Sequence, residues 1–323
     1  MNTSDLRVRV VRKAREALDI STFELVNAEF DRPLPAFSAG SHIDVHLPNG
    51  LTRQYSLCND PSEGGHRYLI GVLRDPSSRG GSQAMHDLVK EGDELSISAP
   101  KNHFPLAHEA AHSVLLAGGI GVTPILCMAE RLAVIGASFE MHFCSRAPER
   151  TAFLERIRAS SFASHVQFYF DDGADSQKLE LNRILSPVRS GTHLYVCGPK
   201  GFMDWVLGAA RSVDWPTSQL HYEFFGAEVA KSVDDESFEV KLARSGKVVT
   251  VAKNQTVVQA LSAVGVEVAV SCEQGVCGMC LTRVLEGEPD HKDMYLTPAE
   301  QATNQQFTPC CSRAKSRLLV LDL

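Results

Sequence analysis

Four cysteines near the end of the chain have the types and spacing needed for metal chemistry. Cys272, Cys277 and Cys280 form a C-x4-C-x2-C run, and Cys310 follows 30 residues after Cys280. Thiolates at this spacing, with a distant fourth, are a ligand pattern of [2Fe–2S] clusters. A zinc site of four cysteines is the alternative, but such sites usually combine two C-x2-C pairs. The run therefore predicts an iron–sulfur centre.

The remaining cysteines do not suggest a disulfide framework. The chain has nine cysteines, an odd number, and Cys58, Cys127, Cys144 and Cys197 are scattered through it. Scattered free thiols are typical of a reducing compartment. Cys311 directly follows Cys310, and adjacent side chains of an extended segment point to opposite faces. Only one of these two cysteines is expected to reach the irons.

Length and composition indicate a soluble protein of several domains. The 323 residues suffice for two or three domains, with 44% hydrophobic and 22% charged residues. A net charge of −7 argues against nucleic acid as a partner. We read no signal peptide and no membrane-spanning stretch. We therefore expect a cytoplasmic protein with no membrane contact, and a monomer.

Residues 1–105 alternate between apolar and polar in short runs. Ile43, Val45 and Leu47 face one way and His42 and Asp44 the other. Further strands are expected at 68–73 and 94–98, and one helix at 82–90. Short strands separated by turn residues predict a small antiparallel β-barrel.

Two pieces of this region could bind an anion and an aromatic ring. Arg53-Gln54-Tyr55-Ser56-Leu57 offers a planar cation, an aromatic ring and hydroxyls. Gly80-Gly81-Ser82 precedes the expected helix, where free N–H groups and the helix dipole favour an anion and Ser82 could cap. Each piece alone is more often an ordinary strand or cap.

Residues 106–226 repeat a strand, turn and helix pattern. Strands are expected at 112–117, 139–144, 165–170, 192–196 and 219–225, and the near-continuous apolar runs predict a doubly wound parallel sheet. The first turn is Gly118-Gly119-Ile120-Gly121-Val122-Thr123-Pro124, which is not G-x-G-x-x-G. A later turn is Cys197-Gly198-Pro199. Ligands of such sheets lie beyond the carboxyl ends of the strands.

Taken together, these motifs resemble the ferredoxin–NADP reductase superfamily. The order Arg-x-Tyr-Ser, Gly-Gly-Ser, G-G-x-G-x-T-P and C-G-P carries the resemblance. It implies a flavin held by Arg53, Tyr55, Ser56, Leu57, Gly71, Val72, Gly80, Gly81 and Ser82. It implies a pyridine nucleotide held by Gly118, Gly119, Gly121, Thr123, Ser145, Arg146, Cys197, Gly198 and Pro199. It also implies that Ser56, Cys197 and Phe225 lie at the reacting rings, with Phe225 over the flavin.

The nucleotide could be NADH or NADPH. An arginine near the second strand end can pair with a 2′-phosphate, and Arg146 stands there. Members with this domain order mostly use NADH, so the resemblance favours NADH.

Residues 227–236 are polar and read as a linker, and residues 237–323 form the last predicted domain. A hairpin, a short helix begun by Thr256, the cysteine loop and closing strands resemble the β-grasp (α+β) fold of plant-type ferredoxins. The closing Cys-x-Ser-Arg of that family aligns with Cys310-Cys311-Ser312-Arg313. The resemblance therefore makes Cys310 the fourth ligand.

The expected fold class is multidomain: an antiparallel β-barrel flavin domain, an α/β doubly wound nucleotide domain and a β-grasp ferredoxin domain. This order resembles the phthalate dioxygenase reductase family, which includes vanillate O-demethylase reductases. The resemblance implies FMN, NADH and a [2Fe–2S] cluster, with electrons passing to the Rieske centre of a separate oxygenase. A flavin suits this task because NADH gives two electrons together while the cluster accepts one.

The sequence leaves three alternatives open. The chain could be an FAD-containing reductase of a soluble monooxygenase, or a stand-alone NADH:acceptor oxidoreductase. A zinc module joined to a nucleotide sensor is the third, and a colourless protein would favour it.

Overall fold

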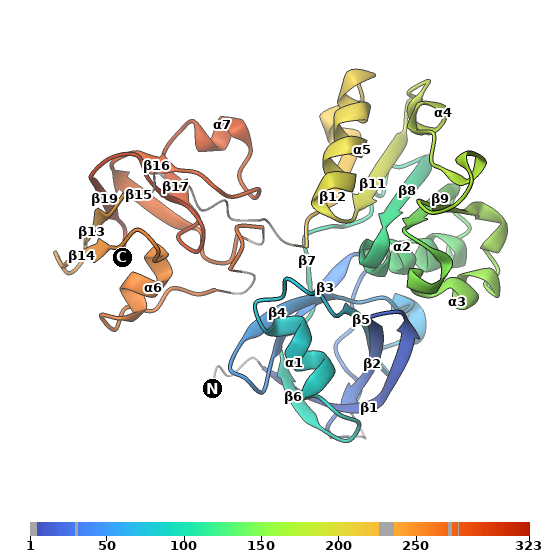
Figure 1. Ribbon diagram of the computed structural model, residues 1–323, viewed down its shortest axis with the longest axis horizontal. Helices are drawn as coiled ribbons and strands as arrows, with labels where there is room; N and C mark the ends of the chain where they lie inside the picture. The colour runs from blue at the N-terminus through green and yellow to red at the C-terminus, as the bar shows by residue number, and fades with distance from the viewer. Residues whose placement is uncertain (1–4, 30–31, 226–235, 271–272, 277) are drawn as a thin grey trace. The chain divides into compact units, whose positions relative to one another are not determined.

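The chain divides into two compact units, residues 1–225 and 226–323. The computed structural model describes residues 5–29, 32–225, 236–270, 273–276 and 278–323. Figure 1 colours the first unit from blue to yellow and the second in orange and red. The finer domain boundaries expected from the sequence remain a prediction.

The first part of unit one is a barrel of seven antiparallel strands. Their order is β4–β3–β6–β1–β2–β5, and β7 pairs with β3. A bridge between Leu57 and Ile70 joins the segment after β4 to β5 and closes the barrel. The bounds are Leu6–Ala17 (β1), Ile20–Asn27 (β2), Ser41–His46 (β3), Thr52–Ser56 (β4), Tyr68–Leu73 (β5), Glu94–Ile97 (β6) and Lys101–Asn102 (β7).

Strand β3 shows how the barrel meets its surroundings. Ile43 and Val45 are fully buried in the barrel core, as their alternation predicts. His42 and Asp44 on the opposite face are buried too, at 4% and 6% exposed. Asp44 is covered by an ion pair with Lys101 at 2.6 Å. The outward face of β3 is therefore an internal contact rather than a solvated surface.

Helix α1, Gly81–Asp87, begins one residue earlier than predicted. Gly80 is its N-cap with φ of 90°, and no side chain caps the helix. The expectation that Ser82 caps this helix is wrong, because glycine supplies the left-handed entry turn. The Ser82 hydroxyl instead accepts a hydrogen bond from the Asp75 N–H at 3.2 Å.

The second part of unit one is a five-stranded parallel sheet in the order β10–β9–β8–β11–β12. Its strands are His112–Gly118 (β8), Phe139–Ser145 (β9), Val166–Phe170 (β10), Thr192–Cys197 (β11) and Leu220–Glu223 (β12). Numbered from β8, this is the order 3-2-1-4-5 of a doubly wound sheet. The order reverses between β8 and β11, so the turns after these two strands flank the switch point where ligands bind.

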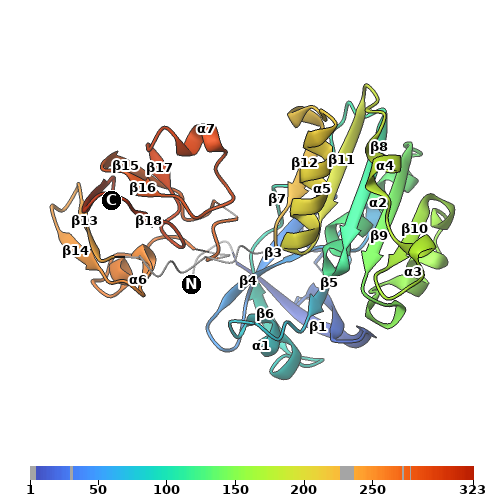
Figure 2. The same ribbon diagram turned by 45° about the horizontal axis from the view of Figure 1, so that its top comes forward.

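Helices cover both faces of this sheet. Leu115 and Ala117 of β8 pack with helix α2, Val122–Val134, and with Ile157 of α3, Leu154–Arg158. Val114 and Leu116 face the other way and pack with α4, Leu181–Leu185, and α5, Lys200–Ser212. This arrangement can be followed in Figure 2. The first of these cores also contains barrel residues, among them Cys58 and Phe104, which joins barrel and sheet into one unit.

Unit two is a five-stranded sheet in the order β14–β13–β19–β15–β17. The central pair, β13 and β19, is parallel and joins the first and last strands of the unit. Helix α6, Val257–Ser262, packs Val257, Ala260 and Leu261 on this sheet. Thr256 caps α6 through the Gln259 N–H, as predicted. Other bounds are Phe238–Leu242 (β13), Val248–Val251 (β14), Thr282–Glu286 (β15), Pro289–Asp290 (β16), Pro298–Gln301 (α7), Gln306–Phe307 (β17), Arg313–Ala314 (β18) and Leu318–Leu321 (β19).

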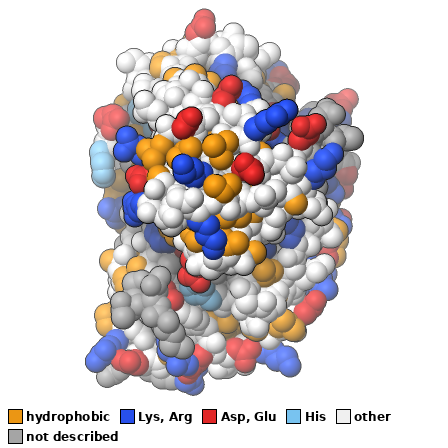
Figure 3. Space-filling model, turned by 90° about the vertical axis from the view of Figure 1, so that its left-hand side faces the viewer, with side chains coloured by type: hydrophobic (Ala, Val, Ile, Leu, Met, Phe, Trp, Pro, Cys, Tyr) orange, Lys and Arg blue, Asp and Glu red, His pale blue; other side chains and the backbone are white. Residues whose placement is uncertain are grey.

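Short 3-10 turns complete the described structure: Pro61–Glu63, Gly119–Gly121, Pro148–Arg150, Ala163–His165, Asp175–Gln177 and Thr217–Gln219. None of the helices in the described ranges has the length and apolar character that a bilayer crossing demands. The face drawn in Figure 3 mixes acidic and basic side chains, with apolar ones between them. Neither positive nor negative charge predominates on that face.

Candidate active site and metal centre

Arg53 of β4 lies across the first turn of α1. A Cβ on Gly81 would come 2.6 Å from Arg53 Cγ and 2.7 Å from its Nε, so only glycine leaves room for this side chain. Arg53 Nη1 also donates to the Thr52 carbonyl at 2.7 Å, which fixes the guanidinium. A planar cation therefore lies against the glycine turn, as a site for a phosphate group requires.

Tyr55, Ser56 and Leu57 follow Arg53 but differ in what they expose. Leu57 is fully buried in the barrel core, so only its backbone could meet a ligand. Tyr55 is partly buried against the same core. Burial raises the pKa of Tyr55 above its ordinary value, so its hydroxyl stays protonated.

Gly71 and Val72 of β5 lie where the barrel meets the sheet. A Cβ on Gly71 would approach the Thr123 methyl to 3.1 Å and the Phe153 ring to 3.2 Å. Gly71 thus allows the start of α2 to pack against the barrel. The Val72 carbonyl already accepts a hydrogen bond from His86 Nε2 at 2.9 Å.

Ser56 reaches across to the sheet and meets a residue that the sequence did not single out. Its hydroxyl donates to Glu223 Oε2 at 3.3 Å. Glu223 is the last residue of β12 and is the register partner of Cys197 at the end of β11. Ser56, Cys197 and Glu223 therefore converge near the switch point. The only signal for Glu223 was its place near the end of a predicted strand, directly before Phe224 and Phe225.

The environment of these groups sets their protonation. Burial raises the pKa of Glu223 to about 7, and the hydrogen bond from Ser56 works against that rise. His42 Nδ1 lies 4.0 Å from Glu223 Oε1. Burial also raises the pKa of the Cys197 thiol well above its ordinary value, and Glu223 raises it further. Cys197 is therefore a neutral thiol at physiological pH, whereas Glu223 can gain or lose a proton there.

The glycine turn is packed tightly on the end of β11. A Cβ on Gly121 would lie 2.3 Å from the Cys197 carbonyl oxygen and 2.6 Å from the Gly198 nitrogen. A Cβ on Gly118 or Gly198 would lie 2.7 Å from the Phe202 ring. Three predicted glycines thus bring the two switch-point turns together.

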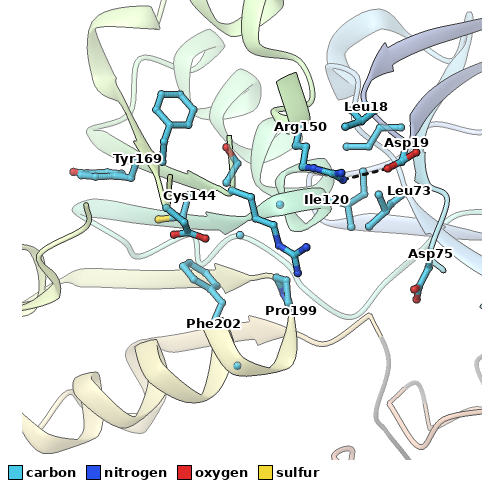
Figure 4. A pocket seen from close by; sticks show the side chains of 18 of the residues that line it. Leu18, Asp19, Leu73, Asp75, Ile120, Cys144, Arg150, Tyr169, Pro199 and Phe202 are labelled. Atoms are coloured by element: carbon cyan, nitrogen blue, oxygen red, sulfur yellow. Dashed lines mark hydrogen bonds and ion pairs between the residues drawn. The ribbon is translucent and has the colours of Figure 1, made fainter. Parts of the chain in front are cut away.

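A cavity of about 940 Å3 opens beside these turns. Predicted nucleotide residues line it: Gly118, Gly119, Ser145, Arg146 and Pro199. Its other walls come from the barrel, including Leu18, Leu73 and Asp75, from the ends of β9 and β10, and from α5. Figure 4 shows Cys144 and Tyr169 on one side and Phe202 and Pro199 on another, with the barrel residues grouped apart from them.

An ion pair between Arg150 Nη1 and Asp19 Oδ2 at 3.1 Å joins barrel and sheet at this cavity (Figure 4). The other predicted nucleotide residues, Gly121, Thr123, Cys197 and Gly198, are buried and do not line the cavity. Arg146 is exposed at the cavity wall. The cavity therefore runs from the barrel to the far ends of β9 and β10.

The two phenylalanines after Glu223 have different surroundings. Phe224 packs on the core that α4 and α5 share and meets Tyr222 edge-on, with ring centroids 5.5 Å apart. Phe225 is 41% exposed. Phe224 is therefore a core residue, whereas the ring of Phe225 is exposed.

Unit two brings three cysteines together beneath its surface. Cys280, Cys310 and Cys311 form one buried cluster, and each is at most 5% exposed. Cys272 and Cys277, the other predicted ligands, lie outside the described residues. Cys280 and Cys310, two of the four predicted ligands, therefore belong to one buried cluster, which suits an iron–sulfur site. Within the described residues alone, no group of three possible metal ligands is found.

Cys311 has its own partners. Its Sγ lies 3.2 Å from Thr308 Oγ1 and packs under the loop, where a Cβ on Gly275 would come within 2.4 Å of it. Gly275 and Gly278 both have positive φ, 71° and 68°, as a tight loop requires. Cys311 thus supports the loop from below through hydrogen bonds and packing.

Comparisons with known proteins agree with this architecture. Residues 240–315 match the family model described as a 2Fe-2S iron-sulfur cluster binding domain. Residues 98–220 match the N-terminal domain of dimethylamine monooxygenase subunit DmmA-like proteins. The prediction of a [2Fe–2S] domain at the C-terminal end is confirmed.

Curated relatives cover nearly the whole chain. A vanillate O-demethylase oxidoreductase from Pseudomonas sp. (strain HR199 / DSM 7063) is 54% identical over 95% of this chain and 96% of its own. A phthalate dioxygenase reductase from Burkholderia cepacia is 40% identical over 98% and 97%. A solved structure of phthalate dioxygenase reductase, described as a modular structure for electron transfer from pyridine nucleotides to [2Fe-2S], covers 99% of this chain and 98% of its own, with 39% identity and a TM-score of 0.80.

These matches confirm the predicted fold class and the resemblance on which it rested. The relatives are named as oxidoreductases or reductases, and the solved structure aligns with nearly the whole of this chain. The chain therefore belongs to the phthalate dioxygenase reductase and vanillate O-demethylase oxidoreductase family.

Proposed function

We propose that the chain is the reductase component of a two-component Rieske oxygenase, and that it passes electrons from NADH through FMN and a [2Fe–2S] cluster. One observation supports this most strongly. Ser56 of the barrel meets Glu223, the register partner of Cys197, at the switch point of the nucleotide sheet. The same chain continues into a 2Fe–2S domain. A junction between flavin and nicotinamide, followed by a one-electron carrier, is what such a reductase needs.

The barrel residues are suited to hold FMN. Arg53 and the turn at Gly80 and Gly81 would bind its phosphate, as the contact between Arg53 and Gly81 supports. Tyr55 would lie along the ring system, and Ser56 would meet its reacting edge. Backbone groups of Leu57, Gly71 and Val72 would contact the ring system, and Ser82 would lie near the phosphate. When bound, FMN takes two electrons together from NADH and gives them up singly.

The cavity of about 940 Å3 is suited to NADH, with its nicotinamide end toward the barrel. The pyrophosphate would lie against Gly118 and Gly119, with Gly121 and Thr123 shaping the turn behind them. Gly198 and Pro199 would lie close to the nicotinamide, and Ser145 and Arg146 beyond the pyrophosphate. Phe225 would cover the flavin until the nicotinamide displaces it.

Three side chains prepare the junction for hydride transfer. Cys197 is neutral and buried, so it shapes the pocket without adding charge. Ser56 holds the Glu223 carboxyl by a hydrogen bond. Oxidation of each NADH to NAD+ releases two electrons and one proton. Glu223, with its pKa raised to about 7, is placed to take up or release a proton beside Ser56.

The cluster would be held by the thiolates of Cys272, Cys277, Cys280 and Cys310. Cys280 and Cys310 are buried together, and Cys311 is engaged with Thr308, which supports this choice. A terminal oxygenase of the O-demethylase or aromatic-ring dioxygenase type would receive the electrons. The names of the relatives, vanillate O-demethylase oxidoreductase and phthalate dioxygenase reductase, point to this partner class.

Reconstitution with purified oxygenases tests the proposal. The chain is mixed with NADH and either a vanillate-type or a phthalate-type oxygenase component, and oxidised product is measured. We expect product with at least one of them, and none when Cys310→Ser replaces the natural chain. Rapid NADH-driven cytochrome reduction without product from any Rieske oxygenase would favour a stand-alone oxidoreductase instead.

A further inference from the structure

The chain has two tryptophans, and they have opposite environments. Trp215 is 5% exposed, and its indole N–H donates to the Leu185 carbonyl at 2.8 Å. Trp205 is 48% exposed and lines the cavity beside the nucleotide turns. Its indole N–H finds no hydrogen-bond partner in the described part of the chain. A buried tryptophan that is satisfied needs no further explanation, whereas Trp205 presents an aromatic surface to a cavity.

The position of Trp205 is fixed by its neighbour on α5. The rings of Phe202 and Trp205 meet edge-on, with centroids 6.3 Å apart and planes at 62°. Phe202 is itself held against Gly118 and Gly198, whose Cα atoms leave no room for a Cβ beside the ring. The switch-point turns therefore support Phe202, and Phe202 supports Trp205. The indole is a positioned group at the cavity wall.

The cavity has one end at the barrel and another at the ends of β9 and β10. Leu73 and Asp75 belong to the barrel end. Tyr169, Lys178 and Leu179 line the cavity together with Trp205 and belong to the nucleotide sheet side. Leu179 also packs on the same core as Phe202, which brings that wall toward α5. Trp205 thus belongs to the part of the cavity away from the barrel.

The direction of the nucleotide follows from the function proposed above, on which this step rests. Apart from Phe225, every residue proposed to hold the flavin belongs to the barrel, so the nicotinamide must point toward the barrel. If the pyrophosphate lies at Gly118 and Gly119, the adenosine half of the nucleotide must lie at the end of the cavity formed by the sheet. Adenine is a flat aromatic ring, and proteins bind such rings by stacking them on the face of an aromatic side chain such as an indole.

We propose that Trp205 is the platform on which the adenine of the pyridine nucleotide stacks, so that α5 carries an adenine subsite. The indole lies away from the reacting rings, so it would contribute equally to binding of substrate and transition state. Trp205→Leu should therefore raise KM for NADH about tenfold and leave kcat unchanged. Trp205→Phe, which keeps an aromatic face, should give a smaller rise.

Fluorescence of the holoenzyme tests the subsite without turnover. AMP, ADP-ribose and nicotinamide mononucleotide are each titrated into the natural chain and into Trp205→Phe. Buried Trp215 remains in both proteins as an internal reference. The difference between the two proteins should show quenching by AMP and ADP-ribose and none by nicotinamide mononucleotide. ADP-ribose should bind Trp205→Leu about tenfold more weakly. Ile135→Ala, an exposed apolar site outside the cavity wall, should bind it as the natural chain does.

Quenching by nicotinamide mononucleotide but not by AMP would overturn the proposal, and so would unchanged ADP-ribose affinity in Trp205→Leu. A separate readout isolates the underlying function. At saturating NADH, flavin bleaching in the natural chain and in Trp205→Leu should be equally complete. If neither bleaches, the NADH-dependent function fails, whatever AMP does to the fluorescence.

Discussion

Among the single residues of the site, Glu223 is the one whose position and acid–base behaviour could not be predicted from the sequence. The motifs identified Ser56 and Cys197 separately, because each stands in a recognisable run. Glu223 contacts Ser56 across 167 positions of the chain, and only folding brings them together. Its acid–base property also arises from burial, which no local pattern predicts.

Replacing this carboxyl should change how stability depends on pH. The folded chain raises the pKa of Glu223 to about 7, so it favours the protonated carboxyl. The resulting stabilisation is complete below the ordinary pKa of a glutamate and is lost as pH rises through about 7. We expect the Tm of the natural chain to fall relative to that of Glu223→Gln between pH 5 and 8. Glu239→Gln, at an exposed position of β13, should leave the pH profile parallel to the natural one. If the Tm of Glu223→Gln also ran parallel to that of the natural chain across this pH range, the pKa of Glu223 would not be raised in the folded chain.

Arg53 should decide flavin retention. Removing its guanidinium takes away the cation beside the glycine turn at Gly81. Arg53→Ala should lower the flavin content of the purified protein and weaken FMN binding by about tenfold or more. Absorbance of released flavin per protein measures this. Arg146→Ala, in the nucleotide cavity, serves as the matched control and should retain flavin. Full occupancy in Arg53→Ala would remove Arg53 from the phosphate site.

At the scale of elements, the sequence predicted the existence of strands and helices better than it predicted where they end. The strand at 68–73 was predicted with the observed bounds, and apolar runs identified the buried parallel strands. The last sheet strand was expected to reach residue 225, but β12 ends at Glu223, because the chain leaves the sheet before the two phenylalanines. The strand order with β8 at the switch point depends on long-range pairing, which periodicity does not encode.

Two glycine-to-alanine substitutions test the packing of the switch-point turns. Gly121 has an ordinary helical φ of −60°, so its need for glycine is purely steric: a Cβ would lie 2.3 Å from the Cys197 carbonyl oxygen. Gly121→Ala should lower Tm by several degrees and raise KM for NADH. Gly208→Ala in α5 is the matched control, because nothing lies within 4 Å of its Cβ position. This control should be neutral or stabilising by up to about 1 kcal/mol. Equal stability of the two variants would contradict the tight contact.

At the scale of the whole molecule, two compact units divide the chemistry. Unit one joins barrel and nucleotide sheet through a shared core, and unit two contains the 2Fe–2S domain. The spacing of the cysteines predicted the 2Fe–2S domain, because the ligands of such a cluster must be cysteines at particular distances along the chain. The shared core of unit one was not predictable, since it combines residues such as Ile20, Cys58 and Phe143 from distant parts of the chain.

The adjacent cysteines allow a direct test of the ligand assignment. Cys310→Ser should remove the visible bands of the cluster and abolish cytochrome c reduction, while NADH still bleaches the flavin. Cys311→Ser should keep the cluster, because Cys311 hydrogen-bonds with Thr308 and packs under Gly275 instead. Visible spectra and cytochrome assays on both variants measure this. Loss of the cluster from Cys311→Ser with retention in Cys310→Ser would reverse the assignment.

The central claim is that this one chain converts the electron pair of NADH into single electrons carried by its cluster. Anaerobic addition of NADH to the purified protein, followed by visible absorbance and electron paramagnetic resonance, tests it most directly. We expect the flavin to bleach first and the signal of a reduced [2Fe–2S] cluster to appear afterwards. A bleached flavin beside a cluster that stays oxidised would contradict it.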